Sequence, residues 1–308
     1  MNKEEFSFTG TGDRELHGTK YSSTGSSAGM LGVIHGMAEH RGRYENFALE
    51  LVAEGYSVST YDQMGHGETA LKNNDPLGHV PLTSGWEGLV DDAKVFLDNI
   101  VPRSESVPIY LFGHSMGSFV TRSLLLEFGE KVDGVILSGT GRTSKALLKS
   151  LQPLAKLERW VRGELTNSFL MEKLLFSSHN SEFEPAETPF DWLSRDEEEV
   201  EKYLQDEFSG FNCTTGFYEA FISGMSDLVK ADEPANIRKD LPILFISGEK
   251  DPVGGKEINA LAKEFVESGL KKVESKIYPG ARHELINETN RDEVIRDVLE
   301  WLERHPSQ

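Results

Sequence analysis

Short β-rich apolar runs alternate with helical patterns along most of this 308-residue chain. The runs are 30–35, 56–61, 107–112, 135–138, 243–247 and 274–278, and the helical patterns are 43–54, 86–100, 118–128, 256–268 and 293–304. Apolar residues at consecutive positions are typical of strands that are covered on both faces. The sequence therefore predicts an α/β fold, with a mostly parallel sheet and helices on both of its faces.

One region, 142–240, departs from this alternation because it holds leucine-rich helical segments and no convincing strand. We therefore predict a core made of 1–141 and 241–308 and a helical cap, 142–240, inserted between two strands. Within the cap, the run from Ser194 to Glu197 fits a capping box and predicts a helix start. Near the N-terminus, residues 6–21 predict an antiparallel hairpin at the sheet edge.

Charge and composition exclude several classes of function. The chain has 32 basic and 51 acidic residues, a formal net charge of −19, which argues against nucleic-acid binding and against basic docking on membranes. A single cysteine, Cys213, cannot form an intramolecular disulfide. The charged N-terminus leads into no apolar run of signal-peptide type, and no run approaches membrane-spanning length. We expect a cytoplasmic protein.

The sequence Gly-x-Ser-x-Gly occurs twice, around Ser27 and around Ser115. A nucleophile elbow requires a strand, a sharp turn and then a helix, so that the serine projects from a strained backbone. Ser115 lies between the apolar run 107–112 and the helical pattern 118–128, whereas Ser27 follows a Ser/Thr/Gly stretch and precedes a strand. The pattern predicts Ser115 as the nucleophile and Ser27 as a turn residue.

A serine nucleophile needs a histidine base that is held by an acid, and in this strand order the acid precedes the histidine. His283 follows the last predicted strand, while His179 lies in the cap and His305 in the tail. Asp251 follows the preceding strand, with Glu249 as the alternative acid. Because open α/β sheets place their sites at the carboxyl ends of the strands, we predict a Ser115, Asp251 and His283 triad.

An oxyanion that forms during acyl transfer needs backbone N–H donors. One donor is expected from the residue after the nucleophile, Met116, and the other from the loop after an early strand. Gly36 allows a tight turn in that loop, so the second donor is the N–H of Met37. The alternative is that His35 and Gly36 are ordinary loop residues.

Together these motifs resemble the monoacylglycerol lipase and lysophospholipase branch of the α/β-hydrolases, in its bacterial type. The segments that carry the resemblance are His35-Gly36-Met37-Ala38-Glu39-His40 with Arg43-Tyr44, Asp62-Gln63-Met64-Gly65-His66-Gly67, Gly113-His114-Ser115-Met116-Gly117, Ser247-Gly248-Glu249-Lys250-Asp251-Pro252 and Tyr278-Pro279-Gly280-Ala281-Arg282-His283-Glu284. The resemblance implies the triad and oxyanion hole given above, a helical cap over an acyl pocket, and neither metal nor organic cofactor. The chain departs from the family at Met64 and Thr69, where Arg and Ser are common.

The expected activity is hydrolysis of a lipid-like ester through an acyl-enzyme, with monoacylglycerol or lysophospholipid as substrate. A short-chain carboxylesterase, thioesterase or peptidase with the same triad and a non-catalytic ligand-binding protein are the alternatives. We expect at most peripheral membrane contact, through the cap. The residues expected to bind substrate are His35, Gly36, His114, Leu148, Phe169 and Leu170. For the cap residues among these, the alternative is a helix stripe that packs on the core.

Overall fold

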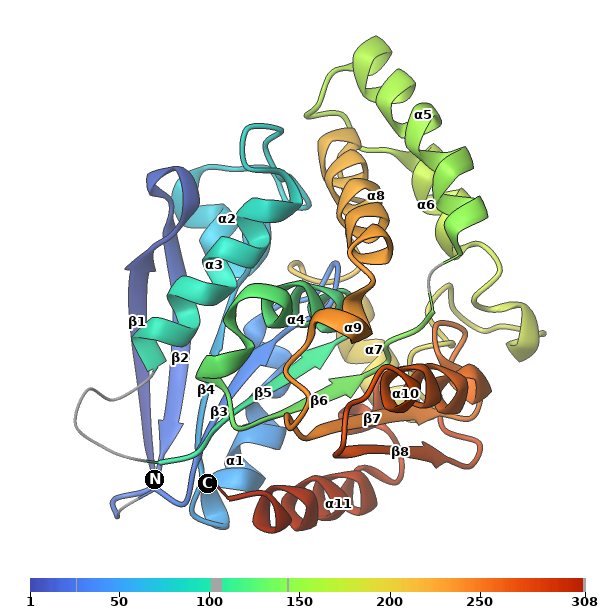
Figure 1. The fold of residues 1–308 in the computed structure, drawn as a ribbon. Helices are drawn as coiled ribbons and strands as arrows, with labels where there is room; N and C mark the ends of the chain where they lie inside the picture. Colours follow the sequence, from blue (N-terminus) through green and yellow to red (C-terminus); the bar gives the residue numbers. More distant parts are fainter. Residues whose placement is uncertain (26, 101–106, 143, 307–308) are drawn as a thin grey trace.

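The computed structural model describes residues 1–25, 27–100, 107–142 and 144–306. Ser26, in the first Gly-x-Ser-x-Gly sequence, and Thr143, in the predicted cap, lie outside these residues. The described strands form one eight-stranded sheet in the order β1-β2-β4-β3-β5-β6-β7-β8 (Figure 1). They are β1 (Asn2–Thr9), β2 (Glu15–Ser22), β3 (Met30–Ile34), β4 (Ser57–Tyr61), β5 (Ile109–His114), β6 (Gly134–Ser138), β7 (Ile243–Gly248) and β8 (Val273–Tyr278).

The sheet is mostly parallel. β1 and β2 form the predicted antiparallel hairpin at one edge, and β2 also pairs antiparallel with β4. The six strands from β4 across to β8 pair parallel with one another, so their carboxyl ends share one edge of the sheet. The predicted α/β architecture is confirmed, and it brings the loops after β3, β5, β7 and β8 to that edge.

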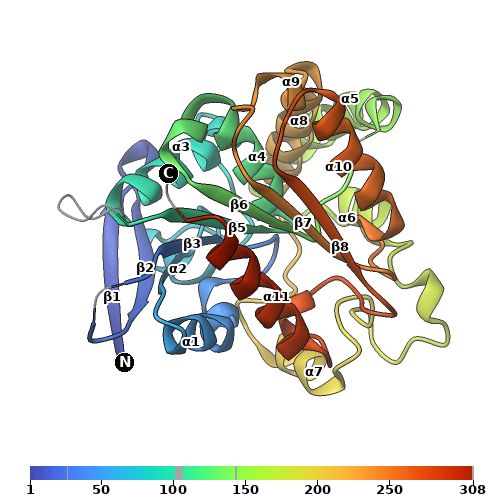
Figure 2. The same cartoon turned by 60° about the horizontal axis from the view of Figure 1, so that its bottom comes forward.

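Helices cover both faces of the sheet and enclose two separate hydrophobic cores. In β7, Ile243 and Phe245 belong to one core and Leu244 and Ile246 to the other, which is why the first four residues of this strand are all apolar. Figure 2 shows α1 and α11 together on one face. The helices of the core are α1 (Glu45–Ala53), α2 (Gly67–Asn73), α3 (Gly85–Ile100), α4 (Met116–Phe128), α10 (Ile258–Glu267) and α11 (Arg291–Arg304).

Between β6 and β7 the described residues form only helices and loops apart from an isolated bridge between Asn167 and Thr214. The helices of this inserted segment are α5 (Lys145–Arg162), α6 (Phe169–Phe176), α7 (Glu197–Gln205), α8 (Thr215–Lys230) and α9 (Glu233–Asn236). α5 packs against α8, and the two stand together above the sheet in Figure 1.

The start of α7 differs from the predicted capping box. The N-cap is Asp196, whose carboxylate accepts a hydrogen bond from the N–H of Glu198 at 3.1 Å. Ser194 is engaged elsewhere, because its hydroxyl donates to the carbonyl of Asn287 at 2.8 Å. The prediction of a helix start at this place is right, but the serine fastens the inserted segment to the loop after β8.

In the described part of the chain, no helix combines the length and the apolar character that crossing a lipid bilayer requires.

Candidate active site

Ser115 lies in a sharp turn between β5 and α4, with φ 50° and ψ −121°. This left-handed φ is rare for a residue with a side chain and costs roughly 1–3 kcal/mol. The start of α4 lies so close to the end of β3 that a Cβ on Gly117 would lie 2.1 Å from the carbonyl oxygen of Ile34. Glycine is therefore required after the elbow. The backbone N–H of Ser115 donates to the carbonyl of Ser138 at 2.9 Å, which ties the elbow to β6.

Asp251 and His283 form a hydrogen-bonded pair in the loops after β7 and β8. The distance from Nδ1 of His283 to Oδ1 of Asp251 is 2.8 Å, and both side chains are buried. Asp251 also accepts hydrogen bonds from the N–H of Val253 at 2.8 Å and from the hydroxyl of Ser247 at 3.1 Å. These bonds fix the carboxylate, and the carboxylate fixes the imidazole ring.

The other ring nitrogen of His283, Nε2, is buried and has no hydrogen-bond partner among the described residues. His283 and Ser115 line the same cavity, but no hydrogen bond joins them. Such contacts are often long in an enzyme without substrate and shorten when substrate binds. The structure thus brings all three predicted residues to one edge of the sheet, with Nε2 available to accept a proton.

The environment of the pair sets its protonation. Burial lowers the pKa of His283, but the charge and hydrogen bond of Asp251 outweigh burial, so this pKa lies above its ordinary value of 6.5. For Asp251, burial raises the pKa, and the charge of His283 with three hydrogen bonds brings it below 3.8. Asp251 therefore stays ionised at neutral pH and stabilises a positively charged His283.

His35 orients the peptide that would supply one oxyanion donor. Its Nε2 accepts a hydrogen bond from the N–H of Gln63 at 2.9 Å, so the ring proton is on Nδ1, which donates to the carbonyl of Gly36 at 2.8 Å. Burial lowers the pKa of His35 to about 3 and keeps the ring neutral. In a trans peptide the N–H points opposite to the carbonyl, so the N–H of Met37 points away from this imidazole.

The loop with Met37 lies directly against the elbow, because a Cβ on Gly36 would be 3.2 Å from Cβ of Ser115. Met116 is the first residue of α4, where backbone N–H groups have no partner within the helix. Among the described residues, neither the N–H of Met37 nor that of Met116 donates to an acceptor in the protein. Both N–H groups are therefore free to donate to a bound substrate, and their role as oxyanion donors stays a prediction.

A buried ionic cluster supports this loop from behind. Glu39 accepts hydrogen bonds from the N–H of Gly36 at 2.5 Å and the hydroxyl of Tyr44 at 2.8 Å. Arg43 lies between Glu39, at 3.5 Å, and Glu284, with which it forms an ion pair. Burial, together with the charge of Glu284, raises the pKa of Glu39 to about 7. The cluster links the Gly36 loop to the residue that follows His283.

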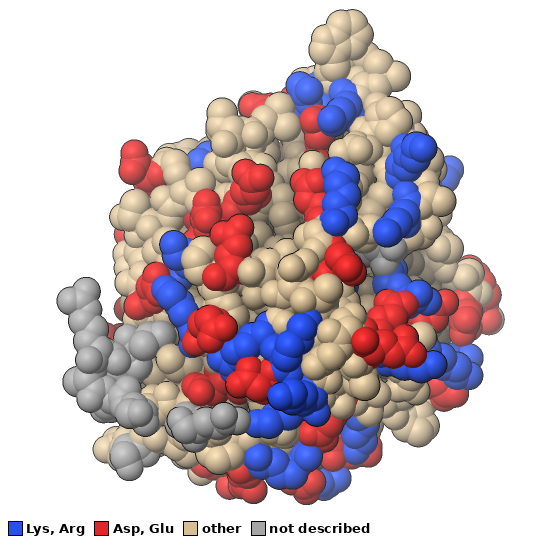
Figure 3. Space-filling view, viewed as in Figure 1, with Lys and Arg blue, Asp and Glu red and all other residues tan. Residues whose placement is uncertain are grey.

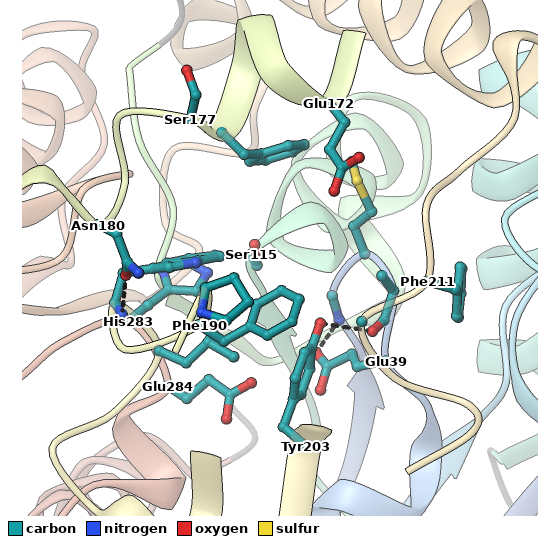
Figure 4. A pocket seen from close by; sticks show the side chains of 18 of the residues that line it. Glu39, Ser115, Glu172, Ser177, Asn180, Phe190, Tyr203, Phe211, His283 and Glu284 are labelled. Carbon is teal, nitrogen blue, oxygen red and sulfur yellow. Dashed lines mark hydrogen bonds between the residues drawn. The ribbon is translucent and has the colours of Figure 1, made fainter. Parts of the chain in front are cut away.

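A cavity of about 540 Å³ opens above Ser115 (Figure 4). Its floor is formed by the core and its roof by the inserted segment. Glu39, Tyr203 and Glu284 lie together on one side in Figure 4. The residues that line the cavity are Gly36, Met37, Ala38, Glu39, His114, Ser115, Phe169, Glu172, Lys173, Phe176, Ser177, Asn180, Pro189, Phe190, Trp192, Leu193, Tyr203, Gly210, Phe211, Tyr218, His283 and Glu284.

Three residues predicted to bind substrate, Gly36, His114 and Phe169, line this cavity, and three do not. Leu148 is only 6% exposed and belongs to the hydrophobic core. Leu170 is 41% exposed on the surface of α6. His35 is buried behind the Gly36 loop, where both ring nitrogens are engaged. Leu148 therefore packs in the core, Leu170 lies on the surface, and His35 supports the Gly36 loop.

Helical geometry explains the outcome for α6. Phe169, Glu172, Lys173 and Phe176 line the cavity, and their spacing of three and four residues defines one face of a helix. Leu170 is about 100° away from Phe169 around the helix axis and points outward. This spacing is visible in the sequence and identifies Phe176 as a lining residue, which our sequence analysis missed.

Trp192, in the loop before α7, is a second residue that the sequence analysis missed. Its ring lies 4.9 Å from the ring of His283, measured between centroids, and its carbonyl accepts the N–H of His283 at 3.3 Å. No motif pointed to this residue, because it reaches the site only through the folding of the inserted segment onto the loop after β8.

The rejected candidates lie away from this chemistry. Ser27 is in the turn before β3, and its hydroxyl donates to the carbonyl of Gly29 at 2.7 Å. Glu249, the alternative acid, accepts the N–H of Gly280 at 3.0 Å and pairs with Lys256 at 3.1 Å. The structure favours Asp251, because it is Asp251 that contacts His283.

A sequence family described as serine aminopeptidase, S33 matches residues 25–290. The chain belongs to this family. The match covers the strands from β3 to β8, the Ser115 elbow and the loops that carry Asp251 and His283.

Named relatives extend over nearly the whole chain. A monoacylglycerol lipase of Mycolicibacterium smegmatis is 25% identical over 98% of this chain and 98% of its own length. The monoglyceride lipase of Mus musculus is 26% identical over 92% of this chain and 84% of its own length. The crystal structure of a thermostable carboxyl esterase from Bacillus coagulans, in complex with glycerol, superimposes with a TM-score of 0.89 at 26% identity and covers 99% of both chains. The resemblance to the monoacylglycerol lipase branch of the α/β-hydrolases is confirmed, and the chain is a hydrolase of that superfamily.

Replacing His35 with alanine is expected to lower kcat for an ester by about 10- to 100-fold, with KM changed by less than about threefold. The reason is that His35 holds the carbonyl of Gly36 and so aims the N–H of Met37, and one oxyanion donor contributes roughly 10²–10³ to the rate. Steady-state kinetics on a p-nitrophenyl ester measure both constants. His305→Ala, near the end of α11, is the control, and an unchanged kcat in folded His35→Ala would refute the orienting role.

Proposed function

We propose that this chain hydrolyses the ester bond of monoacylglycerols through an acyl-enzyme on Ser115. The observation that carries the proposal is the hydrogen bond from Nδ1 of His283 to Asp251. It leaves Nε2 of His283 without a partner among the described residues, and His283 lines the same cavity as Ser115. The names of the similar lipases and of the esterase that binds glycerol support the same substrate class.

The reaction follows from this geometry in two halves. Nε2 of His283 accepts the hydroxyl proton of Ser115 as its Oγ bonds to the ester carbonyl carbon. The N–H groups of Met37 and Met116 donate to the oxyanion, and the imidazolium then protonates the leaving glycerol oxygen as the C–O bond breaks. In the second half, His283 takes a proton from water, whose oxygen attacks the acyl carbon. The fatty acid leaves and the proton returns to Ser115.

The cavity lining includes both aromatic rings and carboxylates, as the two ends of a monoacylglycerol require. Phe169 and Phe176 on α6 and Phe211 supply apolar surface for the acyl chain. Glu39 and Glu284 supply carboxylates that accept hydrogen bonds from glycerol hydroxyls. These two acceptors match the two free hydroxyls of a monoacylglycerol, so the lining favours a glycerol headgroup over one that carries a phosphate.

A substrate panel tests this choice. kcat/KM is measured for a monoacylglycerol, a lysophosphatidylcholine with the same acyl chain, a p-nitrophenyl ester and an aminoacyl p-nitroanilide. We expect the monoacylglycerol to exceed the lysophospholipid by at least about tenfold, which corresponds to roughly 1.4 kcal/mol. A higher value for the lysophospholipid would contradict the headgroup assignment.

The second candidate function is aminopeptidase activity, which the description of the matching family favours. Glu172 lines the cavity and provides a carboxylate that could pair with the ammonium group of a peptide. In the same panel, turnover of the aminoacyl p-nitroanilide above that of every ester would establish this function in place of the first.

We further propose that the inserted segment, 142–240, acts as the cap and makes peripheral contact with lipid aggregates. Trp160 is 76% exposed and Val161 is also exposed at the end of α5. In Figure 3 lysine and arginine side chains gather at the upper right, where α5 lies in the same view. The cationic residues of α5 are Lys145, Lys149, Lys156, Arg159 and Arg162.

Acyl-chain preference is expected to depend on the cavity face of α6. Phe176→Trp narrows the apolar region and should lower the ratio of kcat/KM for a 16-carbon to an 8-carbon monoacylglycerol by about tenfold, through a steric clash of one to a few kcal/mol. Leu170→Trp, on the outer face of the same helix, is the matched control. Equal ratios in wild type and Phe176→Trp would place the acyl chain elsewhere.

A further inference from the structure

The last residue of β6 and the three that follow it, Ser138 to Gly141 (the 138–141 segment), contact the loops of all three proposed triad residues. The carbonyl of Ser138 accepts the N–H of Ser115 at 2.9 Å. Gly139 lies against the base, because a Cβ on Gly139 would be 2.8 Å from Cε1 of His283. This close approach leaves no room for the segment to shift toward the imidazole.

The same segment packs on the loop that holds the acid. A Cβ on Gly254 would lie 2.2 Å from the carbonyl oxygen of Thr140, and a Cβ on Gly141 would lie 2.4 Å from that of Val253. Val253 in turn donates its N–H to the carboxylate of Asp251 at 2.8 Å. The position of the 138–141 segment therefore determines where nucleophile, base and acid stand relative to one another.

One side chain, Arg122, binds the far end of this segment. Its Nη1 donates to the hydroxyl of Thr140 at 3.1 Å and to the carbonyl of Gly141 at 2.9 Å. Its Nε and Nη2 donate to the two carboxylate oxygens of Glu233 at 2.8 and 2.6 Å. Arg122 is 5% exposed and Glu233 is 4% exposed, so both side chains are buried. The four hydrogen bonds to protein atoms replace those that the guanidinium would make with water.

The two partners of Arg122 lie at opposite ends of the inserted segment. Thr140 and Gly141 precede it, and Glu233 is in α9, just before the chain returns to β7. Arg122 itself is on α4, two turns after Ser115, so the helix that begins at the nucleophile also carries the group that holds both ends. A lysine has no such planar fork and cannot satisfy both sides at once.

We propose that Arg122 is a positioning residue for the triad, acting through the 138–141 segment. The proposal rests on the function proposed above, because it assigns that segment a role in aligning Ser115, Asp251 and His283. Arg122 touches neither the cavity lining nor the reacting atoms, so its effect is on alignment. A displacement of about 1 Å in such a constellation lowers the rate by about 100-fold.

The test uses three variants of the full chain. Arg122→Met leaves Glu233 buried without a partner and is expected to be the least stable. The double variant Arg122→Met/Glu233→Met replaces the whole ion pair with apolar side chains and is expected to fold, while Thr140 and Gly141 lose their donors. Arg122→Lys keeps the charge beside Glu233 but not the fork. Arg14→Met/Asp75→Asn, which removes an ion pair of 2.8 Å elsewhere, is the control.

The readouts are kcat and KM for p-nitrophenyl butyrate, the rate of Ser115 labelling by a fluorophosphonate, and Tm. We expect kcat and the labelling rate to fall by about 10- to 100-fold in the folded double variant and in Arg122→Lys. KM should stay within about twofold of the wild-type value. The control variant should keep the wild-type kcat and labelling rate. A merely structural role would lower Tm and leave kcat unchanged in the folded protein, which would overturn the proposal. Failure of all three variants to fold would also overturn it, because positioning presupposes that the fold survives. If wild type itself is not labelled, the proposed function fails instead.

Discussion

Ser115→Ala is expected to lower ester turnover by about 10⁴-fold or more, because alanine has no oxygen that can bond to the acyl carbon. The remaining rate would come from the oxyanion donors and from substrate binding alone. The loss should be seen in kcat for every ester that the wild type hydrolyses. The substitution removes one hydroxyl that lines the cavity and does not fill the hydrophobic core, so Tm should change little.

Ser27→Ala is the matched control for this prediction, because Ser27 occupies the same place in the other Gly-x-Ser-x-Gly sequence. Its hydroxyl donates to the carbonyl of Gly29 and accepts from the N–H of the same residue, both within its own turn, so its loss should leave kcat near the wild-type value. Equal losses in the two variants would contradict the elbow assignment.

Asp251→Asn is expected to lower kcat by about 10³–10⁴-fold and to change the pH profile. His283 must be neutral to accept the serine proton, so kcat/KM falls as pH decreases through the pKa of His283. With Asp251 present this pKa lies above 6.5, and the acid limb of the wild-type profile should therefore lie above pH 6.5. Asparagine supplies no negative charge to offset the lowering of the His283 pKa by burial. The acid limb of the kcat/KM profile should therefore move to lower pH in the variant.

The profile is measured as kcat/KM between about pH 5 and 9 for wild type and variant. Glu249→Gln, which changes the other acidic residue of the same loop, should keep the wild-type limb because Glu249 pairs with Lys256 and does not contact His283. A larger loss in Glu249→Gln than in Asp251→Asn would transfer the role of the acid to Glu249.

The fold could be predicted because burial on both faces leaves a pattern in each strand. β7 is apolar at consecutive positions, since Leu244 faces one core while Phe245 faces the other. The positions of the three proposed triad residues could be predicted for a related reason. Asp251 lies 136 positions after Ser115 and 32 positions before His283 in the sequence. Because parallel strands end at one edge of the sheet, the three residues nevertheless come to the same edge.

The roof of the cavity could not be predicted in the same way. Helices of the inserted segment pack on one another as well as on the core, so an apolar residue such as Leu148 looks alike in sequence whether it lines a cavity or fills a core. Trp192 reaches His283 only because Ser194 and its neighbours bind the loop after β8. Contacts of this kind depend on tertiary structure and leave no local pattern.

His35 shows how a motif can be recognised and its role still misjudged. The sequence placed it beside the oxyanion loop, and we expected contact with substrate. Its two ring nitrogens are instead used by Gln63 and Gly36, and this follows from a buried environment that only the folded chain provides. The histidine therefore orients the Gly36 loop, and it is Gly36 of this loop that lines the cavity.

The most direct test of the account is the intact mass of the protein after treatment with a fluorophosphonate, because the reagent requires an activated serine and no particular substrate. We predict a single adduct on Ser115 in the wild type, none in Ser115→Ala, and labelling slowed by about 10³-fold or more in His283→Ala, which lacks the base. An adduct on another serine, or no adduct on the folded wild type, would contradict the central claim that Ser115, Asp251 and His283 form one catalytic unit.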